Sequence, residues 1–175
     1  QKARALLNVT WTNTAKGRKY DSDVAMKEFV ARAENLGDAG VTYFSHGDAA
    51  KEIAAGARTF KASYTSEHVA QFTMEPMNCT AKVDGDKIEL WVPSQTVAFV
   101  VGGVAAVGGF KPENIKVNIT LLGGGYGRRV EAEYAVEAML IAKAVPGVPV
   151  QMIWTREDDM LRSKPRPLTA QHLIA

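Results

Sequence analysis

The chain has 175 residues, of which 46% are hydrophobic and 23% charged, as is typical of one globular domain or two small lobes that share a core. Its formal net charge of +2 and the lack of any lysine and arginine run argue against a nucleic-acid surface. The longest apolar run, Val97 to Phe110, is too short to span a membrane and contains four glycines, so it predicts a buried helix. The single cysteine, Cys79, excludes an internal disulfide and a cysteine-ligated cluster within the chain.

The first part of the chain alternates between helical and extended patterns. In chain order we expect a short helix running into a strand (3–11), a helix capped by Ser22 or Asp23 and stopped by Gly37 (22–36), a β-rich segment (41–46), a short helix capped by Asp48 (49–57) and a strand (58–66).

The second part begins with two strands joined by Asp84–Asp86, where Asp-Gly favours the positive φ angles of a tight hairpin. The elements expected here are strands at 78–83 and 87–92, the apolar helix 97–110, a half-buried strand at 113–122, an amphipathic helix at 132–144 with Glu133 and Glu137 on its polar face, a strand at 147–155, a helical turn at 156–161 and a final strand at 168–175. Helices and strands are mixed and one hairpin is present. The sequence therefore predicts an α+β fold, a mixed β-sheet with helices packed on it.

The segment GGGYGRR, from Gly123 to Arg129, joins the strand at 113–122 to the helix at 132–144. Glycines adopt backbone angles closed to other residues and let a ligand approach the backbone, and amides at a helix start can hold an anion. Arg128 and Arg129 could add charge-assisted hydrogen bonds to a phosphate or carboxylate. The alternative is a tight turn with two solvated arginines. The spacing fits neither a Walker A loop nor a dinucleotide fingerprint.

Other polar clusters favour structural roles. Glu67, His68, Glu75 and Cys79 lie close in sequence without the spacing of a metal site, so a buried Cys79 and a surface His68 are expected. The acidic triplet 157–159 fits a solvated helix N-terminus, which its dipole favours. His46 and His172 fall in strand-like segments. We assign neither a metal ligand nor a catalytic residue from these patterns.

Four segments in order resemble a known family: FTMEPMNCTA (72–81), LWVPSQT (90–96), LLGGGYGRRVEAEYAVEA (121–138) and WTREDDM (154–160). They are similar to the molybdenum-binding large subunit of the xanthine dehydrogenase and aldehyde oxidase family. Within it they most resemble isoquinoline 1-oxidoreductase β subunits and related bacterial aldehyde dehydrogenases. The four motifs in series are far more specific than any one of them, and they cover most of the chain.

The resemblance implies that the chain is a fragment, since large subunits of this family are several times longer. Residues 1–60 would be an α/β segment leading into the cofactor domain, and residues 61–175 the first part of the molybdopterin-binding domain. The implied cofactor is molybdopterin, often as the cytosine dinucleotide in bacteria. The residues that resemble the family's cofactor loop and its supporting glutamine are Gly124, Gly125, Tyr126, Gly127, Arg128 and Gln95.

The implied reaction is hydroxylation with water as the oxygen source, with electrons leaving through iron–sulfur clusters on a small subunit or another domain. Purine-oxidising members carry a glutamate where this chain has Val130, and a glutamine where an alignment puts Val69. Aldehydes or N-heteroaromatics are therefore the expected small-molecule substrates. The family's general base lies far downstream, so we assign neither Glu131 nor Glu133 to that role, and the isolated chain is expected to be inactive.

Two other hypotheses stay open. The chain could be a binding module without redox chemistry that uses Gly123–Arg129 for a phosphorylated ligand. It could also be a scaffold that packs against the rest of its subunit, which predicts exposed apolar patches on the helices at 97–107 or 132–145. We expect no nucleic-acid partner and no membrane segment in this chain, and the compartment is open between bacterial cytoplasm and periplasm.

Overall fold

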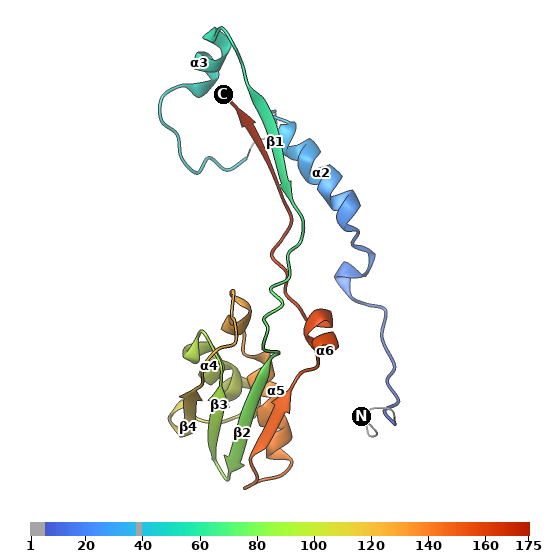
Figure 1. The fold of residues 1–175 in the computed structure, drawn as a ribbon, viewed down its shortest axis with the longest axis vertical. Coiled ribbons are helices and arrows are strands. Elements are labelled where there is room, and N and C mark those ends of the chain that lie inside the picture. The colour runs from blue at the N-terminus through green and yellow to red at the C-terminus, as the bar shows by residue number, and fades with distance from the viewer. Residues whose placement is uncertain (1–5, 38–39) are drawn as a thin grey trace. The chain divides into compact units, whose positions relative to one another are not determined.

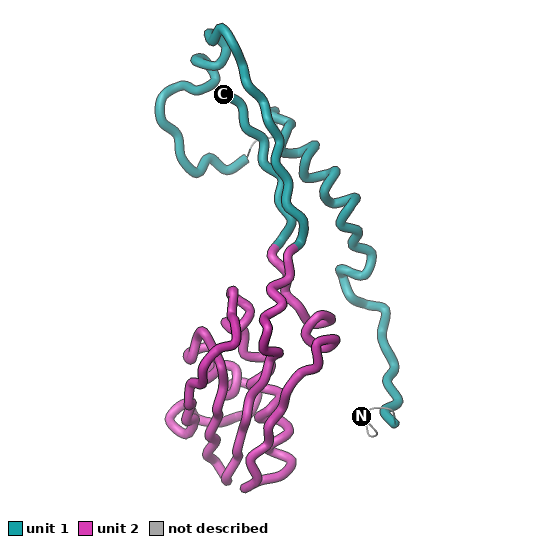
Figure 2. Tube along the Cα trace, viewed as in Figure 1, with its two compact units in different colours: residues 1–68, 167–175 teal, residues 69–166 magenta. Residues whose placement is uncertain are grey.

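The computed structural model describes residues 6–37 and 40–175. The chain divides into unit 1, residues 1–68 and 167–175, and unit 2, residues 69–166 (Figure 2). The predicted boundary at residue 60 stays a prediction. Each unit is described by itself below.

Unit 2 is built on a four-stranded sheet with the strand order β4-β3-β2-β5 (Figure 1). The strands are β2 (Asn78–Asp84), β3 (Lys87–Val92), β4 (Ile115–Ile119) and β5 (Val150–Ile153). β2 pairs antiparallel with β3 and β5, whereas β3 and β4 are parallel. The α+β fold and the mixed sheet are thus confirmed. Gly85 has φ +60° at the first position of the β2–β3 turn, as the predicted hairpin requires.

Two helices cover one face of this sheet. α4 (Val97–Gly108) connects the parallel strands β3 and β4, and α5 (Glu133–Lys143) packs on β2 and on α4. Alternate residues of β2 and β3 point toward the helices, so the core collects the following side chains: Met77, Cys79, Ala81, Val83, Ile88, Leu90, Val92, Val100, Val104, Phe110, Ile115, Tyr134, Ala135, Ala138, Met139, Ala142 and Trp154.

α4 is only half covered, so the expectation of a buried helix is wrong for one of its faces. Val100 and Val104 are buried, but Val97, Phe99 and Val107 are exposed. Only one stripe of a helix can face a single sheet, and the other stripe stays outside whatever its composition.

Unit 2 also contains the 3₁₀ turns η2 (Pro112–Asn114) and η3 (Arg128–Val130) and the short helix α6 (Arg156–Leu161). Thr155 and Asp158 form a capping box at the start of α6. The acidic triplet is not wholly solvated, because Asp159 is buried and accepts a hydrogen bond from Arg156 at 2.8 Å.

Unit 1 consists of η1 (Lys16–Lys19), α2 (Ser22–Glu34), α3 (Ala49–Ala55) and an antiparallel pair, β1 (Lys61–Ser66) with β6 (Thr169–Ile174). α2 packs against both strands. The helix is capped by Asp21, which accepts from the amides of Asp23 and Val24, and not by Ser22 or Asp23 as predicted. Asp48 caps α3 as predicted.

Two predicted strands of unit 1 are absent from the described residues. Residues 7–11 and 41–46 have no regular structure, and residues 3–5 of the first predicted element lie outside the described part. Val41, Tyr43 and Phe44 are more than four-fifths exposed. A β-rich composition forms a strand only where a partner supplies hydrogen bonds and a face to bury, and here neither is present.

Candidate functional site

The glycine segment forms an irregular loop in unit 2 between β4 and η3. Gly124 and Gly127 have φ angles of +102° and +88°, which glycine adopts without steric cost. Tyr126 has φ +52°, an unusual value for a residue with a side chain, and the residue is 74% exposed. The loop is therefore a shaped piece of backbone with an aromatic ring on its outer side.

The other two glycines are required by neighbouring side chains of the protein itself. A Cβ on Gly123 would lie 2.4 Å from Cβ of Glu75, and one on Gly125 would lie 2.7 Å from Cδ of Gln95. The backbone of the loop thus lies directly against Glu75 and Gln95. Close approach of the backbone was predicted, but these two glycines serve contacts within the chain.

Gln95 supports the loop from the segment between β3 and α4. Its side-chain Oε1 accepts hydrogen bonds from the backbone amides of Gly127 at 3.2 Å and Arg129 at 3.3 Å, and its backbone N–H donates to the carbonyl of Arg129 at 3.0 Å. The structure thus brings Gln95 together with the predicted loop residues.

Both arginines of the loop are buried, so the interpretation of a turn with solvated arginines is wrong. Arg129 has no exposed surface and pairs with Glu75 at 2.8 Å. Arg128 is 3% exposed, lies 2.5 Å from Glu133 and stacks over the Trp154 ring at 5.5 Å. Glu133 is therefore a half-buried ion-pair partner and not simply a solvated residue on the polar face of α5.

Three amides of the loop are left for a ligand. Within the described part of the chain, no hydrogen bond is made by the backbone N–H of Gly124, Gly125 or Tyr126. Successive free amides can donate to the oxygen atoms of an anion where the backbone turns them to one side.

A cavity of about 440 Å³ lies beside the loop. It is lined by Val69, Ala70, Gln71, Tyr126 and Arg166. Gln71 donates through Nε2 to the carbonyl of Lys164 at 3.1 Å, while its Oε1 is buried without a partner. A buried acceptor without a donor is costly, so a donor on a ligand or water would stabilise this wall.

Residues 33–173 match the family described as the molybdopterin cofactor-binding domain. The chain belongs to this family. The isoquinoline 1-oxidoreductase β subunit of Brevundimonas diminuta is 32% identical over 169 residues, which are 92% of this chain and 21% of that protein. The aldehyde oxidoreductase molybdenum-binding subunit PaoC of Escherichia coli O157:H7 is 30% identical over 73% of this chain and 17% of its own length. The chain thus spans about a fifth of these curated relatives.

Solved structures support the fold of this molybdopterin cofactor-binding domain. Quinoline 2-oxidoreductase from Pseudomonas putida 86 matches with a TM-score of 0.57 and 24% identity, over 67% of this chain and 15% of that one. Aldehyde oxidoreductase from Desulfovibrio gigas matches with a TM-score of 0.58 and 19% identity, over 73% and 14%. Among residues 6–37 and 40–175, no helix is both long and apolar enough to cross a bilayer.

The glycine loop of the molybdopterin cofactor-binding domain fits an oxygen-rich cofactor. Gly124, Gly125 and Tyr126 offer free amides, and the neighbouring cavity has a buried unpaired acceptor in Gln71. Val69, at the position that the alignment matches to a glutamine of purine-oxidising members, lines the same cavity as Tyr126. These observations fit the predicted binding residues, whose roles stay predictions.

The remaining candidates of the domain have structural partners. Cys79 is buried, and burial raises the pKa of its thiol to about 12. His68 is exposed as expected and bonds to the Tyr20 hydroxyl at 2.7 Å, and His172 bonds to Ser63. Glu131 pairs with Lys164 at 2.9 Å. No group of three or more potential metal-ligating side chains occurs in the described ranges.

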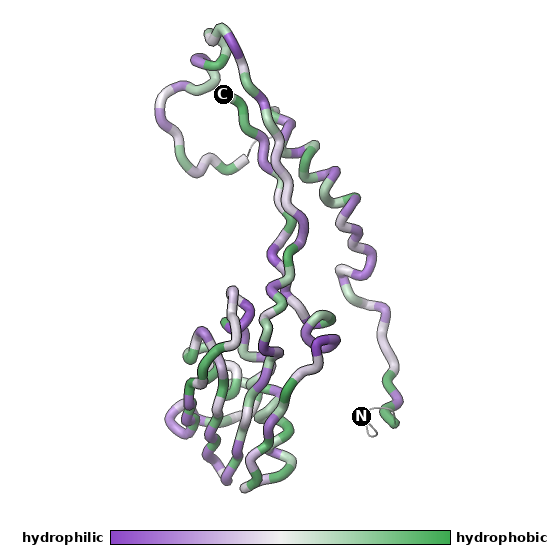
Figure 3. Tube along the Cα trace, in the orientation of Figure 1, coloured by the Kyte–Doolittle hydropathy of each residue, from purple (hydrophilic) through white to green (hydrophobic). Residues whose placement is uncertain are grey.

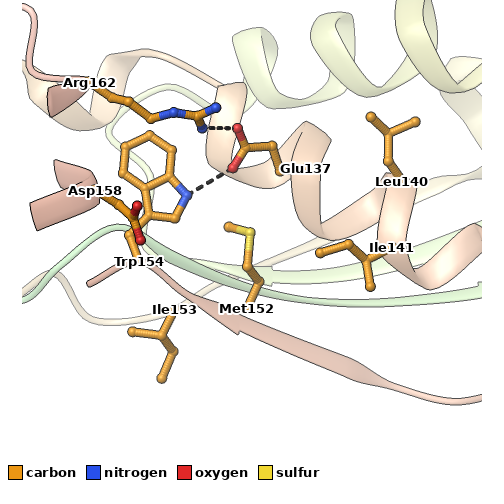
Figure 4. Close-up of a pocket in the computed structure, with 8 residues that line it drawn as sticks. All are labelled: Glu137, Leu140, Ile141, Met152, Ile153, Trp154, Asp158 and Arg162. Carbon is orange, nitrogen blue, oxygen red and sulfur yellow. Dashed lines mark hydrogen bonds and ion pairs between the residues drawn. The ribbon is translucent and has the colours of Figure 1, made fainter. Parts of the chain in front are cut away.

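A second groove of the domain, of about 490 Å³, lies between α5 and β5 (Figure 4). Its apolar lining is Leu140, Ile141, Met152, Ile153 and Trp154. At one end Glu137 accepts from Trp154 Nε1 at 2.9 Å and pairs with Arg162. With the exposed face of α4, this groove gives the apolar surfaces on both helices that the scaffold hypothesis predicted.

Sequence reasoning missed two residues of the loop's support, Glu75 and Arg129, as assigned site residues. Glu75 was weighed only for a metal site, and Arg129 only as a solvated or ligand-binding charge. Their contacts join positions 54 residues apart in the chain. Only the family resemblance, whose motifs at 72–81 and 121–138 contain Glu75 and Arg129, could have indicated that the two residues belong to one site.

Proposed function

We propose that this chain is part of the large subunit of a molybdopterin-dependent oxidoreductase that hydroxylates aldehydes or N-heteroaromatic compounds with water as oxygen source. The observation that carries the proposal is the loop with free amides at Gly124, Gly125 and Tyr126 in a chain of this family. The names of the relatives, an isoquinoline oxidoreductase and aldehyde oxidoreductases, support the substrate classes.

When bound, the cofactor supplies the redox centre of the hydroxylation. The residues of this chain would bind and orient it: the amides of Gly124–Tyr126 would donate hydrogen bonds to its oxygen atoms, and Gln95 would hold Gly127 in place. Arg128 would add positive charge from its buried position behind the loop. Val69 and Tyr126 would form an uncharged wall of the substrate side.

Val130 and Val69 argue against a purine substrate. An aliphatic side chain offers no hydrogen bond to the polar edge of a purine, and a polar ring without its partners binds poorly. An aldehyde or a single-nitrogen heteroaromatic ring needs fewer such partners. We propose the cytosine dinucleotide form of molybdopterin and an iron–sulfur partner subunit as the remaining parts of the enzyme.

The test uses the full-length subunit, purified with its natural partners. We expect molybdenum and a pterin in amounts near one per polypeptide, and oxidation of an aromatic aldehyde or isoquinoline faster than of hypoxanthine. Metal analysis that finds no molybdenum would sink the proposal. Faster oxidation of hypoxanthine would overturn the substrate classes alone.

The binding-module hypothesis has less support from the loop. Both guanidinium groups are buried, so neither is presented to an external phosphate. Arg129 is hydrogen-bonded to Glu75, whereas Arg128 is ion-paired with Glu133 and its guanidinium nitrogens make no hydrogen bond. Titration of the 175-residue chain with inorganic phosphate and a nucleotide decides: saturable binding abolished by Arg128→Ala would restore the hypothesis.

A further inference from the structure

Arg129 connects three separate segments of unit 2 behind the glycine loop. Its Nε donates to the carbonyl of Gly124 at 2.8 Å, and its Nη2 donates to the carbonyl of Glu75 at 2.7 Å and to the Glu75 carboxylate at 2.8 Å. Longer bonds reach the carbonyls of Pro93 and Pro76. The side chain has no exposed surface, so it can act on a ligand only through the backbone that it holds.

Glu75 holds the loop through Gly123. Its Oε2 accepts from the amide of Gly123 at 2.7 Å as well as from Arg129, and its own amide donates to the carbonyl of Gly123 at 3.1 Å. Its Oε1 accepts from Asn78 at 2.9 Å, which ties it to the start of β2. Both backbone groups of Gly123 are thus bonded to one residue.

Glu75 and Arg129 also join the two chain segments that line the cavity beside the loop. Glu75 follows Val69–Gln71, which line the 440 Å³ cavity, and Arg129 follows Tyr126, which lines it too. Phe72 and Tyr126, the described non-glycine residues with positive φ, lie in these two segments at +38° and +52°. Such backbone angles persist only where surrounding contacts over-determine them.

We propose that Glu75 and Arg129 form a positioning pair that fixes the backbone of Gly123–Tyr126 in the orientation required for cofactor retention. The inference rests on the proposed function, because it assigns the pair a role toward the same cofactor. A guanidinium suits this position because its planar fork reaches several acceptors at once, whereas the ammonium of lysine is a single point charge. Arg129 is fully buried and the side chain of Glu75 is 34% exposed, so loss of Glu75 would leave a buried guanidinium without its counter-charge.

The experiment uses the full-length enzyme with Arg129→Met, Arg129→Lys and Glu75→Gln. Molybdenum and pterin content per polypeptide are measured together with the thermal midpoint of the apo form. We expect Arg129→Met and Glu75→Gln to lower cofactor content about tenfold or more, as loss of an outer partner typically does, with partial recovery in Arg129→Lys. The double variant is expected to lose no more than Arg129→Met, because the two side chains act as one unit.

Two controls separate positioning from general stability. Arg162→Met removes an ion pair of unit 2 outside the loop and is expected to retain the cofactor. Leu90→Ala weakens the core without touching the loop, and it sets the cofactor content expected from lowered stability alone. If Arg129→Met does not fold, Glu75→Gln keeps the volume of the side chain and still removes its charge.

The outcomes are distinct. Variants of the pair that retain as much cofactor as Leu90→Ala at the same thermal midpoint overturn the inference while leaving the proposed function intact. A wild-type subunit without molybdenum or pterin overturns the proposed function and this inference with it.

Discussion

Units 1 and 2 have similar proportions of hydrophobic residues but bury them very differently. Figure 3 shows hydrophobic residues along both units. The buried cluster from Met77 to Trp154 lies entirely within unit 2. In the described part of unit 1, Ala25 and Leu168 are the buried apolar residues.

The difference shows that apolar content stabilises a fold only where a second layer covers it. In unit 2, α4 and α5 cover one face of the sheet, and the strands alternate accordingly. In unit 1, one helix packs on two strands, and large side chains such as Trp11, Phe29 and Phe60 stay exposed. Under the proposed function, these side chains are surfaces for the rest of the large subunit.

Replacing matched leucines tests this comparison most strongly. Leu90 of β3 has no exposed surface, whereas Leu173 of β6 is 49% exposed. We expect Leu90→Ala to lower the free energy of unfolding by about 3 kcal/mol through lost transfer energy and a cavity. Leu173→Ala should change it by less than about 1 kcal/mol. Urea unfolding of the 175-residue chain measures both, and equal losses would remove the distinction between the units.

Replacing matched glycines tests whether the exposed loop is held as firmly as the core of unit 2. Gly125→Ala places a methyl group 2.7 Å from Gln95 and is expected to cost about 1–3 kcal/mol. Gly102→Ala in α4 meets open space and should stabilise by about 0.5–1 kcal/mol. Thermal unfolding of both variants gives the values. A neutral Gly125→Ala would mean that Gln95 moves away freely and does not support the loop.

The regular part of unit 2 was predictable because its signals are local. The Asp-Gly turn between β2 and β3, the period-two pattern around Val117 and the helical spacing of α5 each appear within a few residues. The capping residue Asp48 is equally local. The failures at 7–11 and 41–46 have the opposite cause, because a strand needs a partner that local pattern does not reveal.

The site was predictable only in part. The sequence indicated that backbone comes close to something at Gly123–Gly127, and the structure puts Glu75 and Gln95 there as well as free amides. The burial of Arg128 and Arg129 could not be foreseen from local rules, which place charges outside. Their burial depends on the Glu75 and Glu133 carboxylates, and only the folded chain brings the Glu75 carboxylate to Arg129.

The pKa of the Cys79 thiol reports how completely water is excluded from the core of unit 2. Its pKa rises from 9.0 to about 12 through burial, so the unfolded chain loses this proton first as the pH rises. The stability associated with the protonated thiol is fully present below pH 9 and is lost between pH 9 and 12, at about 1.4 kcal/mol per pH unit. Cys79→Ala should remove this part of the slope. Burial also raises the pKa of Tyr134, and the charge of the nearby Cys79 raises it further, so the slope that remains in Cys79→Ala includes a contribution from Tyr134. Urea unfolding from pH 8 to 10.5 measures the slopes, and parallel slopes would contradict the buried thiol.

Matched helix caps give the smallest and most local test of the two units. Asp21 caps α2 in unit 1, and Thr155 caps α6 in unit 2. Each replacement by alanine costs its helix about 1 kcal/mol, but the consequence depends on what the helix is packed against. α2 buries only Ala25, so Asp21→Ala should lower the helical circular dichroism signal without moving the main unfolding transition. The side chain of Arg156 in α6 holds the carbonyls of Thr73 and Met74, so Thr155→Ala should move that transition by about 1 kcal/mol. If Asp21→Ala shifts the main transition as far as Thr155→Ala does, unit 1 unfolds together with unit 2 and the contrast in burial does not translate into a contrast in stability.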